Sequence, residues 1–529
     1  RYCARDSSEK QPIPLWLGLV AYSPTPRLQN IYRSTWQLIG VAPNAKKYAT
    51  SFFGLVYFIF TVVLLLPTFG YAQTKNFTIS EAITGMSGTF AVKNLKQLQW
   101  MGSSDYYAYV QDDSVKQIVK VNASSFQWSE WITLQNMNAL LAKQNIKALT
   151  NFPALNYLSA NECYFQHDQK IILLNANRLE DIQMEVIAEL PKDASEVMVD
   201  TNKMSVAFVS EDNLMVSYRN AKPIKITKDG SKNLVYGQSV HRNEFGIDKG
   251  IFWSTNGNFI AFYKMDQSMV EDYPIIDWSK TPAVANNIKY PFAGRTSHQV
   301  SLGIFDCKTA KTIYLQIDGP KEQYLTAVSW SPDERYIYVT VLNRDQNHAV
   351  MQRYDITGGH AVKKVLEEKN EKYVEPQHPL YFIDNNPNEF LRWSQQDGYM
   401  HLYHYKNEEL VGQLTKGKWI VNELLGYNKT KNEILFMASE ASPMQKNLYA
   451  VNLSTKEVRR VSTTLATHTC KLSASGNYVL DNYAGQNYPR NIEVLNIVNG
   501  NEKRILTAPN TLTEYQLAKV EDVKLKTSD

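Results

Sequence analysis

Residues 236–277 read YGQSVHRNEFGIDKGIFWSTNGNFIAFYKMDQSMVEDYPIID, and this stretch contains the pattern that decides the fold. Apolar and polar side chains alternate over 251–266 on both sides of Asn256-Gly257, a dipeptide that favours tight turns between antiparallel strands. The pattern predicts a pair of strands in one sheet. A charged loop that ends at Glu244 precedes this pair.

The same phrase recurs along the chain: an aromatic or apolar pair, Trp-Ser or a similar dipeptide, a polar turn, and an alternating strand. It appears at 98–110, 252–263 and 328–339, with weaker copies at 424–437 and 470–480, and strand–turn–strand phrases follow at 401–414 and 447–461. Units of four strands, repeated at irregular spacings of about fifty residues or more, predict an all-β fold, a β-propeller whose blades cover each other's edges. Stacked β-sandwiches are the alternative, but they explain the repeated Trp-Ser phrase less well.

Two segments depart from this pattern. Residues 131–144 (WITLQNMNALLAKQ) predict a short helix with packing side chains. Residues 271–296 break the alternation and contain several prolines, so they predict a long excursion from a blade, of a kind that often carries function.

The composition excludes some classes of function. Among 529 residues, 56 basic and 52 acidic side chains give a net charge of +4 without a dense basic run, so nothing indicates nucleic-acid binding. Cys3, Cys163, Cys307 and Cys470 form no CxxC pair, which disfavours a zinc site. One disulfide among the last three and isolated buried thiols both fit this spacing. We predict neither a metal nor a cofactor.

The N-terminal region predicts export. Lys46-Lys47 precede the apolar run 51–69, and small residues follow up to Ala72, as in a secretory signal peptide at 46–72. An uncleaved membrane anchor is the alternative. Residues 1–45 would then be an upstream, non-native leader. The expected location is periplasmic, cell-envelope or extracellular, with membrane attachment if the segment is not cleaved.

Several longer phrases point to a known family. They are HRNEFGIDKGIFWS (241–254), AFYKMDQSMV (261–270), SHQVSLGIFD (297–306), PKEQYLTAVSWSPDERYIYV (320–339), LNRDQN (342–347), YVEPQHPLYF (373–382), LTKGKW (414–419) and SEASP (439–443). In this order they resemble the N-terminal propeller of the dipeptidyl peptidase IV branch of the prolyl oligopeptidase clan, with bacterial prolyl tripeptidyl peptidases as the nearest type. The resemblance implies an eight-bladed β-propeller over 77–510 and the start of an α/β-hydrolase domain at 511–529.

The resemblance also implies an activity. Enzymes of this family are serine exopeptidases that release proline-containing di- or tripeptides from peptide N-termini, and some form homodimers. Their hydrolase domain carries a Ser-Asp-His triad with the serine in a G-x-S-x-G elbow. This chain contains no such elbow, since residues 85–88 (GMSG) lack the spacing. We therefore expect the catalytic residues beyond Asp529, the chain alone to be inactive, and its propeller to gate and recognise substrate. A secreted, non-catalytic propeller that binds peptides or scaffolds partners is the alternative.

The resemblance assigns candidate site residues. In the family, glutamates on the loop before a fourth-blade strand bind the free α-amino group of the substrate. Here Glu244 matches the second glutamate and Asn243 replaces the first, which favours tripeptidyl relatives. Arg242 would either hold Glu244 ionised or contact substrate carbonyls, and Asn243 would donate to a substrate carbonyl or cap the loop. Without the resemblance, Glu244 would be a solvated acid or a partner of Arg242.

Other polar residues are predicted to be structural. The charges of residues 343–347 (NRDQN) follow a strand and are expected to pin adjacent blades. His378, His401 and His404 lack the spacing of metal ligands on a shared helix, so each is expected to be a satisfied structural histidine.

Overall fold

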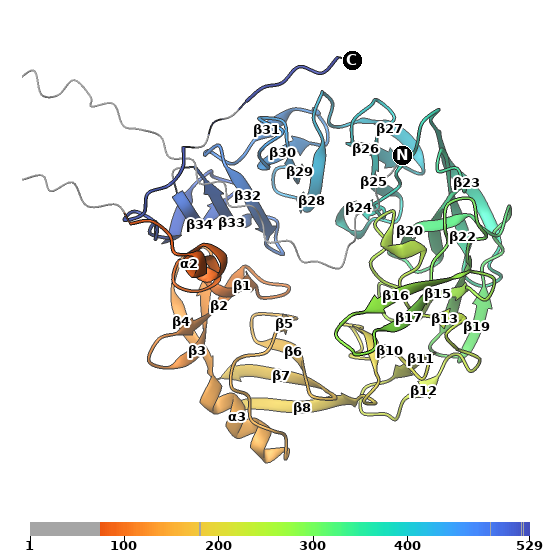
Figure 1. The fold of residues 1–529 in the computed structure, drawn as a ribbon, viewed down its shortest axis with the longest axis horizontal. Helices are drawn as coiled ribbons and strands as arrows, with labels where there is room; N and C mark the ends of the chain where they lie inside the picture. Colours follow the sequence, from red (N-terminus) through yellow and green to blue (C-terminus); the bar gives the residue numbers. More distant parts are fainter. Residues whose placement is uncertain (1–74, 179–180, 487, 520, 522, 529) are drawn as a thin grey trace, which may run out of the picture. The chain divides into compact units, whose positions relative to one another are not determined.

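Within the described residues, eight antiparallel sheets of four or five strands follow one another along the chain, and a two-stranded sheet branches from the fourth (Figure 1). The computed structural model describes residues 75–178, 181–486, 488–519, 521 and 523–528. The predicted leader and signal segment, at 1–72, and Cys3 lie outside these residues. Two units are distinguished: one contains the described part of Arg1–Asn94 with Ala484–Asn491 and Thr507–Asp529, and the other contains Leu95–Tyr483 and Ile492–Leu506. The sheets belong essentially to the second unit.

The first sheet contains β1 (Lys96–Trp100), β2 (Tyr106–Asp112), β3 (Lys116–Asn122) and β4 (Trp128–Thr133), and the second contains β5 (Asn156–Tyr157), β6 (Glu162–His167), β7 (Lys170–Arg178) and β8 (Asp181–Glu189). The third contains β9 (Ser195–Val199), β10 (Val206–Ser210), β11 (Asn213–Ser217) and β12 (Ile224–Lys225). The fourth contains five strands, β13 (Leu234–Tyr236), β14 (Ile251–Trp253), β15 (Phe259–Asp266), β18 (Gln299–Asp306) and β19 (Lys311–Tyr314).

The fifth sheet contains β20 (Tyr324–Trp330), β21 (Tyr336–Leu342), β22 (His348–Asp355) and β23 (Ala361–Lys369), and the sixth contains β24 (Tyr381–Phe382), β25 (Glu389–Ser394), β26 (His401–Lys406) and β27 (Glu409–Gln413). The seventh contains β28 (Val421–Asn428), β29 (Glu433–Ala438), β30 (Asn447–Asn452) and β31 (Val458–Arg460). The eighth contains β32 (Thr467–Leu472), β33 (Tyr478–Gly485), β34 (Tyr488–Asn496) and β35 (Glu502–Thr507).

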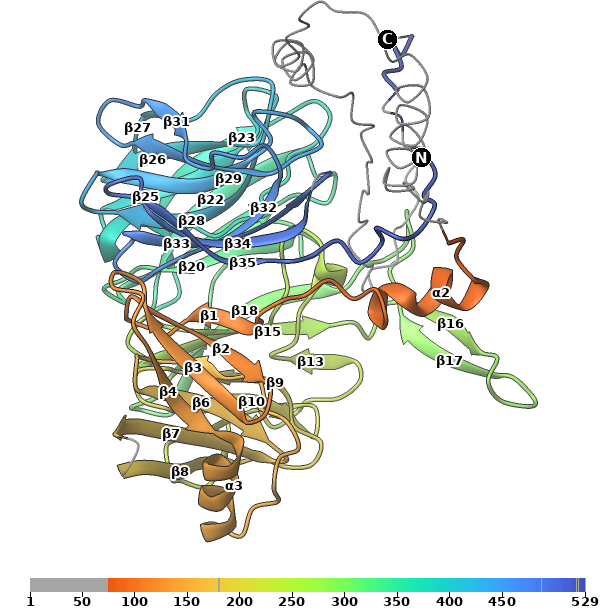
Figure 2. The ribbon, with the colours of Figure 1, turned by 90° about the vertical axis from the view of Figure 1, so that its left-hand side faces the viewer.

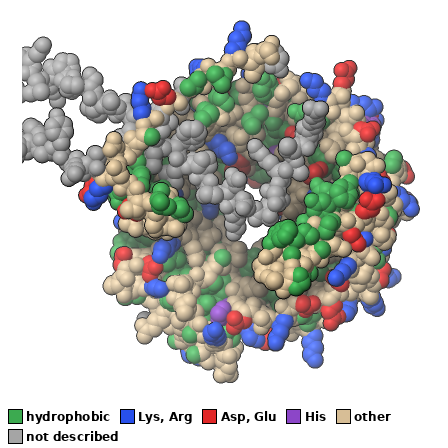
Figure 3. All heavy atoms as spheres, in the orientation of Figure 1, with side chains coloured by type: hydrophobic (Ala, Val, Ile, Leu, Met, Phe, Trp, Pro, Cys, Tyr) green, Lys and Arg blue, Asp and Glu red, His purple; other side chains and the backbone are tan. Residues whose placement is uncertain are grey.

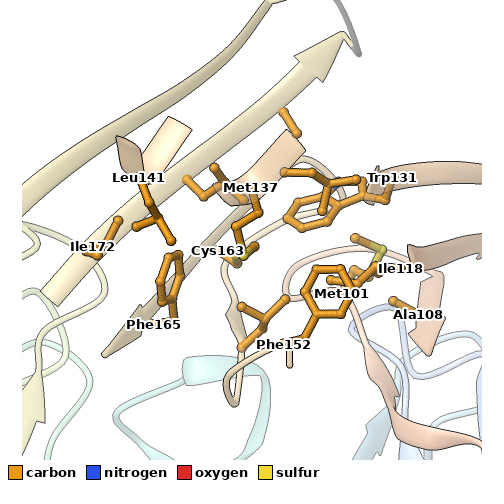
Figure 4. Close-up of a cluster of buried hydrophobic side chains, with 14 of the residues drawn as sticks. Met101, Ala108, Ile118, Trp131, Met137, Leu141, Phe152, Cys163, Phe165 and Ile172 are labelled. Atoms are coloured by element: carbon orange, nitrogen blue, oxygen red, sulfur yellow. The ribbon is translucent and has the colours of Figure 1, made fainter. Parts of the chain in front are cut away.

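Buried apolar side chains fill the space between neighbouring sheets. Between the first and second sheets, Trp131 and Phe165 pack with Met137 from helix α3 (Leu134–Lys143) (Figure 4). Between the eighth sheet and the first, Leu480 packs against Tyr107, so the last sheet closes the ring on the first. The ring therefore covers the faces of every sheet within it and leaves only the short edges of the individual blades.

The predicted strand pair at 251–266 is confirmed as β14 and β15, in which Phe252 pairs with Ala261. Its turn contains Gly257, whose φ of 66° is left-handed. A Cβ atom there would lie 2.2 Å from a carboxylate oxygen of Asp200, so the turn needs glycine. The other predicted phrases are confirmed as the pairs β1–β2, β20–β21, β28–β29 and β32–β33.

The helix predicted at 131–144 is shorter than expected. Residues up to Thr133 belong to β4, and Thr133 caps the helix because its hydroxyl accepts a hydrogen bond from the Asn136 N–H at 3.0 Å. Cys163, Cys307 and Cys470 are free thiols, and the first and last are buried, so the disulfide alternative is not realised among the described cysteines. Within the described residues, no helix combines the length and apolar character needed to cross a bilayer.

The predicted excursion at 271–296 contains a separate hairpin, formed by β16 (Asp272–Asp277) and β17 (Val284–Lys289) (Figure 2). This hairpin is inserted in the sequence between β15 and β18 of the fourth sheet. Several of its apolar side chains are exposed, including Ile275 and Trp278, and hydrophobic side chains gather over it in Figure 3.

The smaller unit is built around stacked rings. Tyr515 stacks on Phe77 with 4.7 Å between ring centres, and Phe90 meets Tyr515 edge-on. Helix α2 (Ile79–Thr84) begins with a capping box between Thr78 and Glu81.

Candidate functional site

The loop before β14 adopts a left-handed turn. His241, Arg242 and Asn243 have φ angles of 53°, 57° and 60°, and Phe245 has a φ of 54°. Side chains with a Cβ atom pay roughly 1–2 kcal/mol per residue for this conformation. The loop therefore persists only because contacts on both sides hold it.

The first contact is a buried pair of histidines. The Leu325 N–H donates to Nε2 of His241 at 3.2 Å, so Nδ1 of His241 carries the proton and donates to Nε2 of His298 at 2.8 Å. Burial holds the pKa of His241 well below its usual range, and burial followed by the charge of Arg344 lowers the pKa of His298 to about 4. Both rings are therefore neutral near pH 7.

The second contact lies on the other side of Glu244. The Thr326 hydroxyl donates to the carbonyl of Phe245 at 2.8 Å, and the ring of Tyr324 lies 5.0 Å from that of Phe245. Gly246 has a φ of 70°, and a Cβ atom there would lie 1.9 Å from the Gln377 carbonyl oxygen. Glu244 thus projects from a backbone that is fixed before and after it.

The histidine pair should make folding stability depend on pH. In the unfolded chain His298 titrates near pH 6.5, whereas in the folded protein its pKa is about 4. Between these values the unfolded state binds more protons, so stability is fully present above pH 6.5 and falls as the pH drops towards 4. The expected loss is about 3 kcal/mol.

Urea unfolding at pH 4.5 and pH 7 measures this loss. Because carboxylates also titrate in this range, the control is His298→Gln, which keeps a hydrogen-bond acceptor without a titratable ring. This variant should show a clearly smaller decrease. An equal decrease in both proteins would contradict the prediction.

Arg242 and Asn243 turn away from Glu244. The Arg242 guanidinium donates to the Lys289 carbonyl and lies over the Tyr290 ring, 5.0 Å from its centre. Arg242 is thereby attached to the base of the β16–β17 hairpin rather than to Glu244. The amide oxygen of Asn243 accepts a hydrogen bond from the Ser239 hydroxyl, which is the loop-capping arrangement considered from the sequence.

The Glu244 carboxylate is exposed but partly desolvated. This loss of hydration raises its pKa, and the positive charge of Arg344 opposes the rise. Among the described residues, no cationic nitrogen lies within 4.0 Å of this carboxylate. The site therefore presents a carboxylate without a contact ion pair.

Arg344 is the charged neighbour of Glu244, although its sequence pattern predicts a role in holding adjacent blades together. The residues 343–347 were expected to pin blades, yet Arg344 lies within electrostatic range of Glu244 and donates to the hydroxyl of Tyr324. No local pattern identifies this role. The only signal was that the phrase 342–347 belongs to the resemblance, as does the loop of Glu244.

The expectation of a satisfied structural histidine is confirmed for His401, whose ring nitrogens contact the Thr415 hydroxyl and the Gly417 carbonyl, each at 3.0 Å. His404 meets the expectation only in part, because its Nε2 lies 2.8 Å from a Glu389 carboxylate oxygen while its buried Nδ1 has no hydrogen-bond partner among the described residues. His378 stacks on the ring of Trp393.

One cluster of possible metal ligands was not expected from the sequence. Donor atoms of His468, Cys470 and Asp481, all buried, lie within 4.8 Å of one another. Nδ1 of His468 lies 2.8 Å from Asp481, however, and its Nε2 lies 2.9 Å from the Thr464 carbonyl. Both ring nitrogens face oxygen acceptors, so the geometry is that of an internally satisfied hydrogen-bond network joining β32 to β33.

A closed ring of eight four-stranded units, the fourth extended by one strand, defines an eight-bladed β-propeller. The loop of Glu244 enters the fourth blade. The model of the Dipeptidyl peptidase IV (DPP IV) N-terminal region matches residues 168–490, more than half of the chain. The chain belongs to this family, as the resemblance implied.

Curated proteins that are similar in sequence include two named probable dipeptidyl-aminopeptidase B. Probable dipeptidyl-aminopeptidase B of Arthroderma otae is 26% identical over 326 residues, covering 54% of this chain and 34% of that protein. The protein of the same name from Tuber melanosporum is 27% identical over 329 residues, covering 54% and 36%. The chain thus matches about a third of the length of these relatives.

Two solved structures share the fold. A candidate dipeptidyl aminopeptidase IV from Bacteroides ovatus superposes with a TM-score of 0.76 at 33% identity, covering 84% of this chain and 64% of that one. Dipeptidyl peptidase 4 from Porphyromonas gingivalis has a TM-score of 0.68 at 20% identity, covering 83% and 63%, and supports the fold alone.

Proposed function

We propose that this propeller recognises the N-terminus of peptide substrates for an exopeptidase, with Glu244 binding the free α-ammonium group. The observation that carries the proposal is the Glu244 carboxylate, held on a constrained loop and lacking a contact ion pair among the described residues. A peptide ammonium supplies the cation and the hydrogen-bond donors that such a carboxylate can accept.

Anchoring the N-terminus would also measure substrate length. A peptide held at its first residue places a fixed number of residues between the anchor and the nucleophile. We propose that the nucleophile is a serine of an α/β-hydrolase domain and that cleavage follows a proline near the N-terminus. Asn243, standing where dipeptidyl peptidases of this family carry the first of two adjacent glutamates, favours release of tripeptides.

We also propose that the protein is exported. The support is the sequence of residues 46–72, in which two lysines precede an apolar run and small residues end it.

The test of the proposed function is binding of one peptide in two forms. The hexapeptide Ala-Ala-Pro-Ala-Ala-Ala amide, with either a free or an acetylated N-terminus, is titrated into the protein by calorimetry at pH 7. The free form should bind at least about tenfold more tightly, because a hydrogen bond to a charged group contributes about 1.5–3 kcal/mol. Equal affinity for both forms would contradict amine recognition.

A further inference from the structure

Arg344 occupies a fixed position beside the candidate amine site. It follows β21 and is half-buried, its guanidinium donates to the hydroxyl of Tyr324, and it lies 5.5 Å from the centre of that ring. The Gln346 side-chain amide donates to the same hydroxyl at 3.3 Å. Two donors thus converge on the Tyr324 oxygen, which holds the guanidinium against the ring.

Tyr324 in turn contacts the residues on both sides of the turn that presents Glu244. Its ring centre lies 4.9 Å from that of His241 and 5.0 Å from that of Phe245. Tyr324 is buried, so this contact is part of the packed structure and not a surface encounter. The hydroxyl that holds Arg344 therefore belongs to the ring that supports the turn.

Arg344 is close to Glu244 without forming a contact ion pair. Its charge acts on Glu244 as well as on His241 and His298, yet no cationic nitrogen of the described residues comes within 4.0 Å of the Glu244 carboxylate. A guanidinium that closed on this carboxylate would occupy the position that a substrate ammonium needs. The tether to Tyr324 accounts for the separation.

Two other charged groups near the turn have partners of their own. Arg242 is bound to the Lys289 carbonyl and the Tyr290 ring, and the Glu322 carboxylate accepts a hydrogen bond from the Ser297 N–H at 3.0 Å. His241 and His298 are neutral near pH 7, because the pKa of each lies below its usual value. Arg344 is thus the cation that acts on Glu244.

We propose that Arg344 is the positioning residue of the amine site: its charge keeps Glu244 ionised, while Tyr324 holds its guanidinium back so that the carboxylate stays open for the substrate ammonium. This inference rests on the proposed function of Glu244. It assigns two residues of the fifth blade, Tyr324 and Arg344, to a site whose binding group comes from the fourth.

The first test replaces the charge. Arg344→Gln and the charge-conserving control Arg344→Lys are titrated with the free-amine hexapeptide between pH 5.0 and 7.5, where most of the peptide amine is protonated. Without the cation the pKa of Glu244 rises, so Arg344→Gln should lose up to about tenfold in affinity at pH 5.0. It should stay within about twofold of the unchanged protein at pH 7.5, where Glu244 is ionised in both. Arg344→Lys should follow the unchanged protein at every pH.

The second test removes the tether. Tyr324→Phe keeps the ring but not the hydroxyl, so the guanidinium can close on Glu244 and compete with the ammonium. This variant should bind the peptide less tightly at every pH. The double variant Tyr324→Phe with Arg344→Gln should regain affinity at pH 7.5, since no cation remains to compete.

The outcomes separate this inference from the proposed function. A uniform loss of affinity for Arg344→Gln at all pH values, an unshifted pH profile, or no recovery in the double variant would overturn the positioning role. If Glu244→Gln also bound the peptide as tightly as the unchanged protein, the proposed function itself would fail. Thermal unfolding by circular dichroism at each pH identifies variants that lose binding through misfolding. If Tyr324→Phe is one of these, the comparison of Arg344→Gln with Arg344→Lys at pH 5.0, where their affinities are expected to differ, decides.

Discussion

Replacing Glu244 by Gln is expected to remove the preference for peptides with a free N-terminus. The substitution keeps the size of the side chain and its carbonyl oxygen but removes the charge that would attract the ammonium group. A hydrogen bond to a charged group contributes about 1.5–3 kcal/mol, so affinity for the free-amine hexapeptide should fall about tenfold to a hundredfold. Affinity for the acetylated peptide should not change.

The matched control is Glu457→Gln, which removes an exposed carboxylate between β30 and β31, away from the loop of Glu244. It should leave both affinities unchanged. In a protein that carries the catalytic domain, the same Glu244 variant should lower kcat/KM for substrates with free N-termini. If the Glu244→Gln protein still bound the free-amine peptide more tightly than the acetylated one, Glu244 would not be the group that binds the amine.

The largest loss of stability is expected when Glu368 is replaced by Ala. Glu368 on β23 and Arg392 on β25 form an ion pair between the fifth and sixth blades, with only 7% of each side chain exposed, and the Ser394 hydroxyl donates to the same carboxylate at 3.0 Å. Removing one partner leaves a buried cation without its counter-charge. Such changes cost about 3–5 kcal/mol, which urea unfolding would detect as a lower midpoint.

Two controls define the cause. The pair between Lys429 and Asp384 is exposed, at 74% and 53%, so Lys429→Met should change the unfolding free energy by at most about 1 kcal/mol. Replacing both Glu368 and Arg392 by Leu and Met should recover much of the loss, because no unpaired charge then remains. A Glu368→Ala protein as stable as the Lys429→Met protein would refute the prediction.

Local turn chemistry explains how far the fold could be predicted. The Asn-Gly turn between β14 and β15 and the Pro-Asp-Glu turn between β20 and β21 separate two strands each, and these turn residues identify both strand pairs from the sequence. The second and third blades carry no such phrase. Strand β10 (Val206–Ser210) is buried along its whole length, so its apolar run does not alternate and could not be told from other buried segments.

The candidate site could be predicted only in part. The resemblance singled out Glu244, but the left-handed backbone at His241 could not be foreseen, since a residue with a Cβ atom adopts it only under constraint. That constraint comes from His298 and Thr326, which lie far along the chain. The pairing of Arg242 with the hairpin, and not with Glu244, likewise depends on where the hairpin folds back.

Alternation and turn residues act over a few neighbouring positions, so they are enough to predict the strands and turns of those blades whose phrases carry both signals. Which charges meet depends instead on how the blades pack. Glu244 precedes a strand of the fourth blade, whereas Tyr324 begins and Arg344 follows strands of the fifth. The packing of these two blades brings the three residues together, and no periodic pattern in the sequence could predict that they lie close to one another.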